Sequence, residues 1–477
     1  MKIVLTQPNY AWFNKRVWAM PPYTLALLNA CLKSDHDVQL FDPNYNNLTE
    51  EEVFNYFNKV KPEVVGVSSI STEYIKANKL MNSIIKKAVP DSILIQGGII
   101  PTVVPEIATK DPNVDYWILG EGEYRFPSLL NELKKSKQNF SSLDGLAYKK
   151  NGIIKLKKPK GFIQDLDSLP FSDYGNLDLL DYGNKALRYS PQLLPRKFPY
   201  AVTITSRGCP YECIFCASST VSGRKIRFRS AENVLEEIDT LYRAGIREII
   251  FLDDHFLGNR KRAVKIMQGL VKRKYDLTWK CVNMTVFLLN DKILELMRES
   301  GCYQITLSIE SGNQYVLNKI IKKAVKLNKI HGVLNKAKSL GFEILANFVI
   351  GFPGETWEQI RETFRFAETI NVDMANFHLA TPLPKTELME ICLREGYLPK
   401  DFNIKESLNS GYAKGLISTS EFTPSELEIL RAFEWDRINF SKAERRKAIA
   451  RIEGISLKEM KEWRMKTRQK FGINVVL

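Results

Sequence analysis

Three cysteines that fall within eight consecutive residues constrain this chain more than any other feature of its sequence. They are Cys209, Cys213 and Cys216, in a C-x3-C-x2-C arrangement. Thiolates are soft ligands that suit zinc ions and iron–sulfur clusters. Three thiolates on one short loop can hold three corners of an iron–sulfur cube and leave the fourth iron open, which a structural metal site does not do. The run therefore predicts a cluster that binds a substrate, with a zinc knuckle as the alternative.

The position of this cysteine loop in the predicted fold favours the catalytic cluster. The loop follows an apolar, strand-like stretch at residues 200–205, so we expect it at the C-terminal end of a strand. In a parallel α/β barrel this end is the catalytic face. Zinc knuckles commonly use two separated pairs of ligands, and neither a second C-x2-C pair nor an H-x3–5-H pair lies nearby.

The rest of the composition is that of an ordinary globular protein. A length of 477 residues predicts roughly two to four domains. No apolar run approaches the ~18 residues of a membrane span, and the apolar part of residues 1–8 is too short for a signal peptide. We therefore expect a cytoplasmic protein. The other four cysteines are expected to be buried thiols rather than disulfides: Cys31, Cys281, Cys302 and Cys392.

The net charge of +15 invites a nucleic-acid or anionic-membrane partner. The excess is uneven, because residues 441–477 hold eleven Lys and Arg against four Asp and Glu. A basic C-terminal face could contact RNA, a phosphorylated substrate or lipid head groups. A solvated basic face without a partner explains the same composition at least as well, so such a contact is not favoured.

Apolar runs and amphipathic stretches alternate through the N-terminal part of the chain. Strands are expected at residues 2–5, 38–41, 64–68, 92–96 and 116–119, and helices at 24–33, 50–60, 74–88, 104–109 and 123–135. This alternation predicts a doubly wound, Rossmann-like parallel sheet in a first domain, residues 1–140. Ligands of such sheets bind beyond the C-terminal ends of the strands.

Small and polar residues gather at those predicted strand ends. Glycines let a ligand approach the backbone closely, and hydroxyl groups offer hydrogen bonds. The residues are Gln7 and Pro8; Ser68, Ser69, Ser71 and Thr72; Gly97, Gly98, Pro101 and Thr102; and Gly120 and Gly122. None of them forms G-x-G-x-x-G, so a nicotinamide or flavin site is not indicated. Taken alone, these stretches are equally consistent with ordinary strand–helix turns.

A hairpin and a linker are expected at residues 141–199. Residues 146–155 contain two strand-like runs around an Asn-Gly turn. Residues 157–199 are rich in Pro, Asp, Tyr and Leu without a period, which indicates a linker.

The alternation of strands and helices returns at residues 200–390. Strands are expected at residues 201–205, 248–252, 278–282, 304–309, 343–350 and 374–380, and helices at 231–244, 261–273, 291–299, 327–340 and 357–369. Six units instead of eight predict an open, partial TIM-like barrel. Ser230 is expected as an N-cap and Gly245, Gly301 and Gly341 as helix ends. Residues 391–477 read as a small, mainly helical C-terminal region.

Polar residues and glycines also stand at the expected C-terminal ends of the barrel strands. They are Asp253 and Asp254, Ser308 and Glu310, and Gly351 and Gly354. Carboxylates suit an ammonium group and ribose hydroxyls, and a glycine-rich backbone suits an adenine ring. Each of these could instead cap a barrel strand. His255 and His378 also lie at strand ends, where a proton-handling role is possible but a hydrogen-bonded structural histidine is the more common case.

The cysteine loop resembles the signature of the radical S-adenosylmethionine (radical SAM) family, including the aromatic Phe215 before the last cysteine. This resemblance implies a 4Fe-4S cluster on the three cysteines, whose open iron chelates the ammonium and carboxylate of SAM. It implies a SAM site at matching positions of the barrel: Phe215, Asp253, Asp254, Ser308, Glu310, Gly351 and Gly354. Which of the adjacent Asp253 and Asp254 faces SAM stays open.

The order of a Rossmann-like module, a linker and the cysteine loop resembles the cobalamin-dependent radical SAM enzymes over most of the first 390 residues. The resemblance implies that the first domain binds cobalamin at Pro8, Pro22, Ser68, Ser69, Ser71, Thr72, Gly97, Gly98, Pro101, Gly120 and Gly122. Many cobalamin domains supply a histidine from D-x-H-x-x-G, which this module lacks. The string does occur at residues 253–258, inside the barrel, and is interpreted as a chance match.

The resemblance implies a 5′-deoxyadenosyl radical and, with cobalamin, methyl transfer to an unactivated carbon of a small-molecule or natural-product substrate. An electron donor such as flavodoxin or ferredoxin would be a partner. Cobalamin-dependent cyclisation or rearrangement without methylation is the alternative within the family. A basic, metal-knuckle nucleic-acid-binding protein is the alternative from another class, and the sequence does not reveal the substrate.

Overall fold

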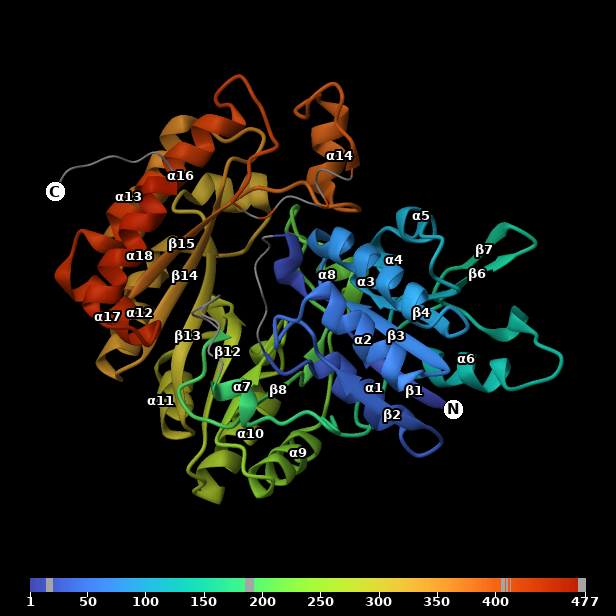
Figure 1. Ribbon diagram of the computed structural model, residues 1–477. Coiled ribbons are helices and arrows are strands. Elements are labelled where there is room, and N and C mark those ends of the chain that lie inside the picture. Colours follow the sequence, from blue (N-terminus) through green and yellow to red (C-terminus); the bar gives the residue numbers. More distant parts are fainter. Residues whose placement is uncertain (14–19, 185–192, 405–407, 409–410, 412, 471–477) are drawn as a thin grey trace.

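The computed structural model describes the chain except residues 14–19, 185–192, 405–407, 409–410, 412 and 471–477. Two sheets dominate it (Figure 1). The N-terminal sheet lies beside the first strands of the second sheet, and the C-terminal helices cover the opposite edge of that second sheet. Predictions for the linker and for the C-terminal region fall partly outside the described residues.

The N-terminal sheet has seven strands in the order β2-β1-β3-β4-β5-β6-β7. Its strands are β1 (Lys2–Thr6), β2 (Asp37–Phe41), β3 (Val64–Ser69), β4 (Ile93–Gly98), β5 (Tyr116–Ile118), β6 (Leu146–Lys150) and β7 (Ile153–Lys157). The first five are parallel, as the alternating pattern predicted. The hairpin expected beside the linker instead pairs with β5 and adds two antiparallel strands to this sheet.

The helices of this half alternate with its strands along the chain. They are α1 (Tyr23–Leu32), α2 (Glu50–Val60), α3 (Ile75–Ala88), the short α4 (Ile99–Val103) and α5 (Pro105–Ala108), and α6 (Arg125–Leu133). Local sequence sets their ends. For example, α2 begins at a capping box in which Thr49 and Glu52 bond each other's backbone, and its buried Val53 and Phe57 face the core.

The second sheet has six parallel strands in the order β15-β14-β13-β12-β11-β8, which confirms a partial barrel. Its strands are β8 (Tyr200–Thr203), β11 (Glu248–Phe251), β12 (Thr278–Met284), β13 (Cys302–Glu310), β14 (Glu343–Ile350) and β15 (Met374–Leu379). Its outer helices are α9 (Ala231–Arg243), α10 (Arg260–Arg273), α11 (Asp291–Glu299), α12 (Ile330–Ser339) and α13 (Trp357–Thr369). Ser230 caps α9 as expected, and the three predicted helix-end glycines all have positive φ.

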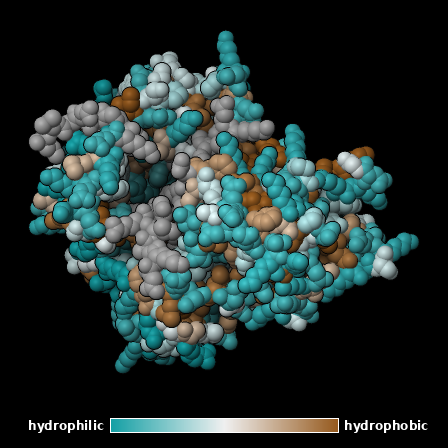
Figure 2. Space-filling model, in the orientation of Figure 1, coloured by the Kyte–Doolittle hydropathy of each residue, from teal (hydrophilic) through white to brown (hydrophobic). Residues whose placement is uncertain are grey.

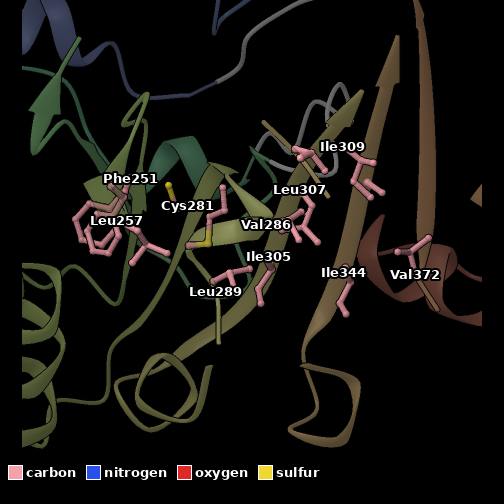
Figure 3. Packing of buried hydrophobic residues seen from close by; sticks show 14 of the residues in the cluster. Phe251, Leu257, Cys281, Val286, Leu289, Ile305, Leu307, Ile309, Ile344 and Val372 are labelled. Atoms are coloured by element: carbon pink, nitrogen blue, oxygen red, sulfur yellow. The ribbon is translucent and has the colours of Figure 1, made fainter. Parts of the chain in front are cut away.

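Alternate residues of these strands face the outer helices and form the largest core of the molecule. Ile305, Leu307 and Ile309 of β13 belong to it, together with Ile344 of β14 (Figure 3). The intervening residues of the same strands therefore face the concave, inner side of the sheet. This inner side is where an open barrel can receive ligands.

The N-terminal half covers the inner side of the first barrel strands. Tyr200 and Val202 of β8 pack in one buried cluster with Tyr23, Leu27 and Tyr45. A short antiparallel ribbon, β9 (Ser206–Arg207) with β10 (Arg227–Phe228), follows β8 and carries the cysteine loop and the small helix α8 (Ser218–Ser222).

The C-terminal helices α16 (Pro424–Phe440), α17 (Ala443–Ile452) and α18 (Leu457–Lys470) lie at the free edge of β15. The shorter α14 (Glu387–Arg394) lies apart from them and bonds the cysteine loop, where the Leu388 N–H donates to the Ile214 C=O at 2.9 Å. The side-chain amide of Asn439 bonds both the N–H and the C=O of Ala375, at 2.9 and 2.8 Å, so α16 satisfies backbone groups that an open edge would leave unpaired. In the described part of the chain no helix combines the length and apolar character needed to cross a bilayer.

Candidate active site

The cysteine loop connects β9 to β10 and is fixed by backbone hydrogen bonds. The N–H of Cys209 donates to the C=O of Gly223 at 3.1 Å, and the N–H of Ile214 donates to the C=O of Ile321 at 3.2 Å. Gly208, just before the first cysteine, has φ of +98°, and a Cβ there would lie 2.6 Å from the Lys225 carbonyl oxygen. Only glycine fits this start of the loop.

The three predicted cluster ligands lie close enough together to influence one another's ionisation. Burial raises the pKa of Cys213 to about 12. The Lys323 ammonium opposes this shift, whereas the Glu310 carboxylate and the thiols of Cys216 and Cys209 add to it. Cys216 is the most exposed of the three cysteine residues. Burial of its sulfur, and after it the Asp254 and Glu310 carboxylates, raise its pKa. A bound metal cluster would keep these sulfurs deprotonated.

The donor set of the loop is that of an iron–sulfur cluster. A structural zinc ion takes four ligands on one ion, whereas a cube receives each thiolate on a different iron and can leave one iron open. The donor set, three sulfurs on one rigid loop beside a cationic lysine, fits a 4Fe-4S cluster.

The two adjacent aspartates at the end of β11 have different surroundings. Both oxygens of Asp253 are used within the protein: they accept the Thr205 N–H and hydroxyl at 2.8 and 2.6 Å and the Ser206 hydroxyl at 2.5 Å. Asp254 accepts the Ser218 hydroxyl at 2.9 Å and also faces a large cavity. Burial raises the pKa of Asp254. Asp253 thus holds the strand that leads to the cysteine loop, and Asp254 is the one open to a ligand.

The residues predicted at the end of β13 lie near the cysteine loop but are partly engaged. Glu310, at φ of +73°, pairs with Lys323 at 2.7 Å, and both side chains are about nine-tenths buried. Lys323 is thereby held beside the thiols whose pKa values it lowers. The Ser308 hydroxyl donates to the Asn283 amide oxygen at 2.5 Å.

The glycine-rich loop after β14 is shaped by Glu355. Gly351 and Gly354 both have φ of +84°. One oxygen of the fully buried Glu355 accepts the N–H groups of Gly351 and Phe352, at 2.7 and 3.1 Å, and the other oxygen has no partner among the described residues. The ring of Phe215 lies 5.8 Å from that of Phe352, so this loop contacts the cysteine loop.

A cavity of about 520 Å³ lies between the carboxyl ends of the two sheets. The predicted residues that line it are Pro22, Ser68, Ser69, Gly97, Gly98, Gly120, Gly122 and Asp254. Of the predicted cobalamin residues, Pro8, Ser71, Thr72 and Pro101 do not line it, and of the predicted cluster and SAM residues only Asp254 does. Ser71 instead caps a helical turn through the N–H of Glu73, and Pro101 is buried within α4.

The cavity also has lining residues that were not named as cobalamin ligands. They include Gln7, Ile99, Thr102, Glu121, Arg207 and Val282. Gln7 and Thr102 stand in the strand-end stretches that the sequence singled out, so their neighbourhood was predictable. The contribution of Arg207 and Val282 depends on how the two halves meet, and no local pattern indicates it.

Two neighbouring glycines give the cavity its floor at the end of β4. A Cβ on Gly97 would meet no atom within 4 Å, so glycine here leaves open space. A Cβ on Gly98, at φ of +83°, would lie 2.3 Å from the Ser69 carbonyl oxygen. The first glycine is thus a cradle that a side chain would fill, as the fit of a large planar cofactor requires, and the second is needed by the backbone itself.

Buried ion pairs join the two halves at the cavity wall. Arg207 pairs with Glu121 at 2.9 Å and with Glu123 at 2.6 Å, and Arg227 pairs with Glu121 at 2.7 Å. Although burial opposes ionisation, the Arg207 guanidinium and hydrogen bonds hold the pKa of Glu121 below its usual value. Arg207 therefore bonds to the N-terminal half and not to solvent at the surface.

His255 supports the cysteine loop from outside. Its Nε2 lies 3.4 Å from the Tyr211 hydroxyl, and the two rings pack edge to face. Burial, and next the Lys323 charge, lower the pKa of His255. His255 is not among the residues that line the cavity.

Each half of the chain matches a known protein family. The model of the Radical SAM superfamily matches residues 203–367, and that of the B12 binding domain matches residues 15–130. An uncharacterized methyltransferase of Pyrococcus horikoshii is 33% identical over 402 residues, covering 83% of this chain and 84% of the relative. An anaerobic magnesium-protoporphyrin IX monomethyl ester cyclase of Rubrivivax gelatinosus is 27% identical, covering 82% and 70%.

A solved structure shares the fold. The radical S-adenosylmethionine methyltransferase TsrM from Kitasatospora setae, with cobalamin and a [4Fe-4S] cluster bound, superposes with a TM-score of 0.70 at 16% identity, covering 92% of this chain and 85% of that one. The chain belongs to the family of radical SAM enzymes that carry an N-terminal B12-binding domain.

The buried ion pairs give a first prediction. Replacing Arg207 by Gln leaves the Glu123 carboxylate buried without a cation, which costs about 3–5 kcal/mol when one partner of a buried pair is removed. The free energy of unfolding of Arg207→Gln, measured by urea denaturation, should fall accordingly. Arg224→Gln removes the exposed pair with Glu212 and serves as the matched control, with little expected change. Equal stability of the two variants would contradict the assignment.

The buried Glu355 gives a second prediction. Burial raises its pKa to about 7, although two backbone N–H groups oppose the shift. Its folded-state pKa therefore exceeds its unfolded one, so stability is lost as pH rises from about 4.5 to about 7. Compared with Glu355→Gln, the wild-type free energy of unfolding should fall over that window by about 3 kcal/mol. Parallel pH profiles for the two proteins, from urea denaturation, would refute this.

Proposed function

We propose that this enzyme uses a 4Fe-4S cluster, SAM and cobalamin to transfer a methyl group to an unactivated carbon of a small molecule. One observation carries the proposal: a single cavity runs from Gly97 and Gly120 in the B12-binding half to Asp254 at the edge of the cysteine loop. A corrinoid against the strand ends and a SAM molecule that reaches Asp254 would therefore border the same space. The methyltransferase relative from Pyrococcus horikoshii supports the same reaction type.

We also propose roles for individual residues. Cys209, Cys213 and Cys216 hold three irons of the cluster. Asp254 accepts from the SAM ammonium, because its neighbour Asp253 has no oxygen left for a ligand. Ser308 and Glu310 approach the ribose and carboxylate side of SAM. Phe215, Gly351 and Gly354 form the surface on which the adenine rests.

On the other wall, cobalamin lies against the strand ends of the N-terminal sheet. Gly97 leaves the space, and the Ser69 hydroxyl, which donates to the Gly97 carbonyl at 3.1 Å and accepts from the Ile100 N–H at 3.0 Å, keeps the loop beneath it in shape. Of the earlier candidates, Pro22, Ser68, Gly98, Gly120 and Gly122 remain, whereas Pro8, Ser71, Thr72 and Pro101 lie outside the cavity lining.

When bound, the cluster with SAM supplies a radical that removes hydrogen from a carbon, and the corrinoid supplies the methyl group. The protein holds the reacting groups and keeps water away. Arg207 and its two glutamates fix the wall that separates the cysteine loop from the corrinoid-facing loop after β5. Lys323 places a positive charge beside the thiolates and offsets part of their negative charge.

Cyclisation without methylation is the second candidate, favoured by the cyclase relative from Rubrivivax gelatinosus. Both reactions need one electron from outside, for which an acidic redox protein such as flavodoxin or ferredoxin is the proposed donor. Incubation with SAM labelled in its methyl group separates them. Methyl transfer places the label in a product, whereas cyclisation leaves the label in methionine.

A pair of variants tests the two-cofactor site. Gly97→Leu should fold and keep its iron, because its side chain meets open space, but should lose the absorbance of bound hydroxocobalamin after anaerobic reconstitution. Cys213→Ala should lose iron and SAM cleavage. Gly332→Leu, at an open position on α12, is the control and should keep both. Full corrinoid binding by Gly97→Leu, or deoxyadenosine formation by Cys213→Ala, would overturn the proposal.

A further inference from the structure

A pair of asparagines, Asn347 and Asn376, stands side by side on the inner face of the barrel sheet. They are direct partners in the register of β14 and β15, and Asn376 Nδ2 donates to Asn347 Oδ1 at 3.1 Å. The residues that follow them, Phe348 and Phe377, belong to the core under the outer helices, with ring centroids 5.4 Å apart. Because alternate residues face opposite sides, the two amides point inward.

The same level of the sheet carries a second polar pair on the next two strands. Ser308 of β13 is the register partner of Asn347 and bonds Asn283 of β12. A row of four polar side chains thus crosses β12, β13, β14 and β15. The Ser308 end faces the proposed SAM site near Glu310. The asparagine pair lies at the other end, beside the C-terminal helices, and has no role in binding SAM or cobalamin as proposed above.

Such a row is unusual in the interior of a barrel, which bulky aliphatic side chains normally fill. The asparagine pair is only partly buried although both residues lie midway along their strands. Each amide offers two donors and two acceptor positions, and the contacts seen in the described part of the chain use one hydrogen bond between the two side chains. The remaining positions are directed to accessible space.

The layers above and below define what can reach this pair. Below it, Leu345 and Met374 are buried against Ile449 and Phe440 of the C-terminal helices, so the floor is closed and apolar. Above it on the same face are Val349 and His378. Figure 2 shows a hollow with a hydrophilic floor where Figure 1 draws β14 and β15. In the described part of the chain both asparagines are partly exposed, so the pair keeps an accessible side.

We propose that Asn347 and Asn376 form the substrate subsite, and that they bind an uncharged part of the substrate that both donates and accepts hydrogen bonds, such as a carboxamide, a lactam or a group of hydroxyls. The inference rests on the proposed function, because it places the substrate in the same open barrel. Neutral amides match neutral partners, and neither the pair itself nor the apolar layer beneath it carries a charge. Arg431 of α16 also reaches β15, but its guanidinium donates to the Phe377 carbonyl oxygen at 3.4 Å. A group bound here lies on the inner face that Glu310 and the cysteine loop border.

Binding of defined probes to the fully reconstituted protein tests this subsite without turnover. Uridine and N-acetylglucosamine serve as uncharged probes, and uridine monophosphate and glucuronate as their acidic counterparts, with affinities measured by isothermal titration. The uncharged probes should bind weakly, in the millimolar range typical of fragments. Asn347→Leu and Asn376→Leu should each weaken binding about tenfold or more, because leucine keeps the volume but offers no hydrogen bond.

Asn318→Leu, on the exposed surface, should leave affinity unchanged, and unchanged iron and corrinoid content shows that each variant is folded. Absence of saturable binding by the uncharged probes, binding by the acidic probes alone, or equal affinity in the asparagine variants would overturn the subsite. If the reconstituted wild-type protein binds the probes but does not cleave SAM, the proposed function fails while the subsite stands, so the two failures are distinguishable.

Discussion

The active site of this enzyme depends on a set of buried ion pairs that local sequence patterns do not indicate. Arg207 stands one residue before the loop that begins at Gly208, and its guanidinium bonds two glutamates that follow the fifth strand of the other half. Buried ions are stable only when they are paired and hydrogen-bonded. The two halves therefore have one favoured alignment at this point. Because the cavity lies between them, this alignment sets its shape.

Segments that cover its two edge strands explain how the barrel can remain open. A sheet of six strands leaves one side uncovered, and a deoxyadenosyl radical formed there would meet water. The N-terminal half covers the inner side of β8 with Tyr23 and Leu27, while α16 covers the free edge of β15 through Asn439. These two covers leave part of the inner face accessible, and this part carries the polar row from β12 to β15 in which we place the substrate. Exclusion of water and access of a substrate are thus separated along one sheet.

Periodicity and caps made most of the fold predictable from the sequence. The bounds of α2, α11, α13 and β14 are those expected, because their apolar spacing and capping residues are local signals. The pairing of the hairpin β6–β7 with β5 was missed, since edge-to-edge pairing is not encoded in either strand alone. The three cysteines were equally visible, because their spacing is itself the signal.

The finer features of the site were not predictable in the same way. Asp253 and Asp254 are identical in type and adjacent, and only the hydroxyls of Thr205 and Ser206 decide which one remains open. Strand-end composition likewise placed Ser71 beside a ligand, although its side chain caps a helical turn. Direction of a side chain depends on contacts between distant segments, whereas composition reports only which residue types are near.

The most direct test of this account is a crystal structure of the protein reconstituted anaerobically with iron, sulfide, hydroxocobalamin and SAM. The account predicts one cluster on Cys209, Cys213 and Cys216, SAM with its ammonium at Asp254, and the corrinoid against Gly97, all bordering the same cavity. A corrinoid bound outside that cavity, or the three sulfurs bound to a single metal ion, would contradict it.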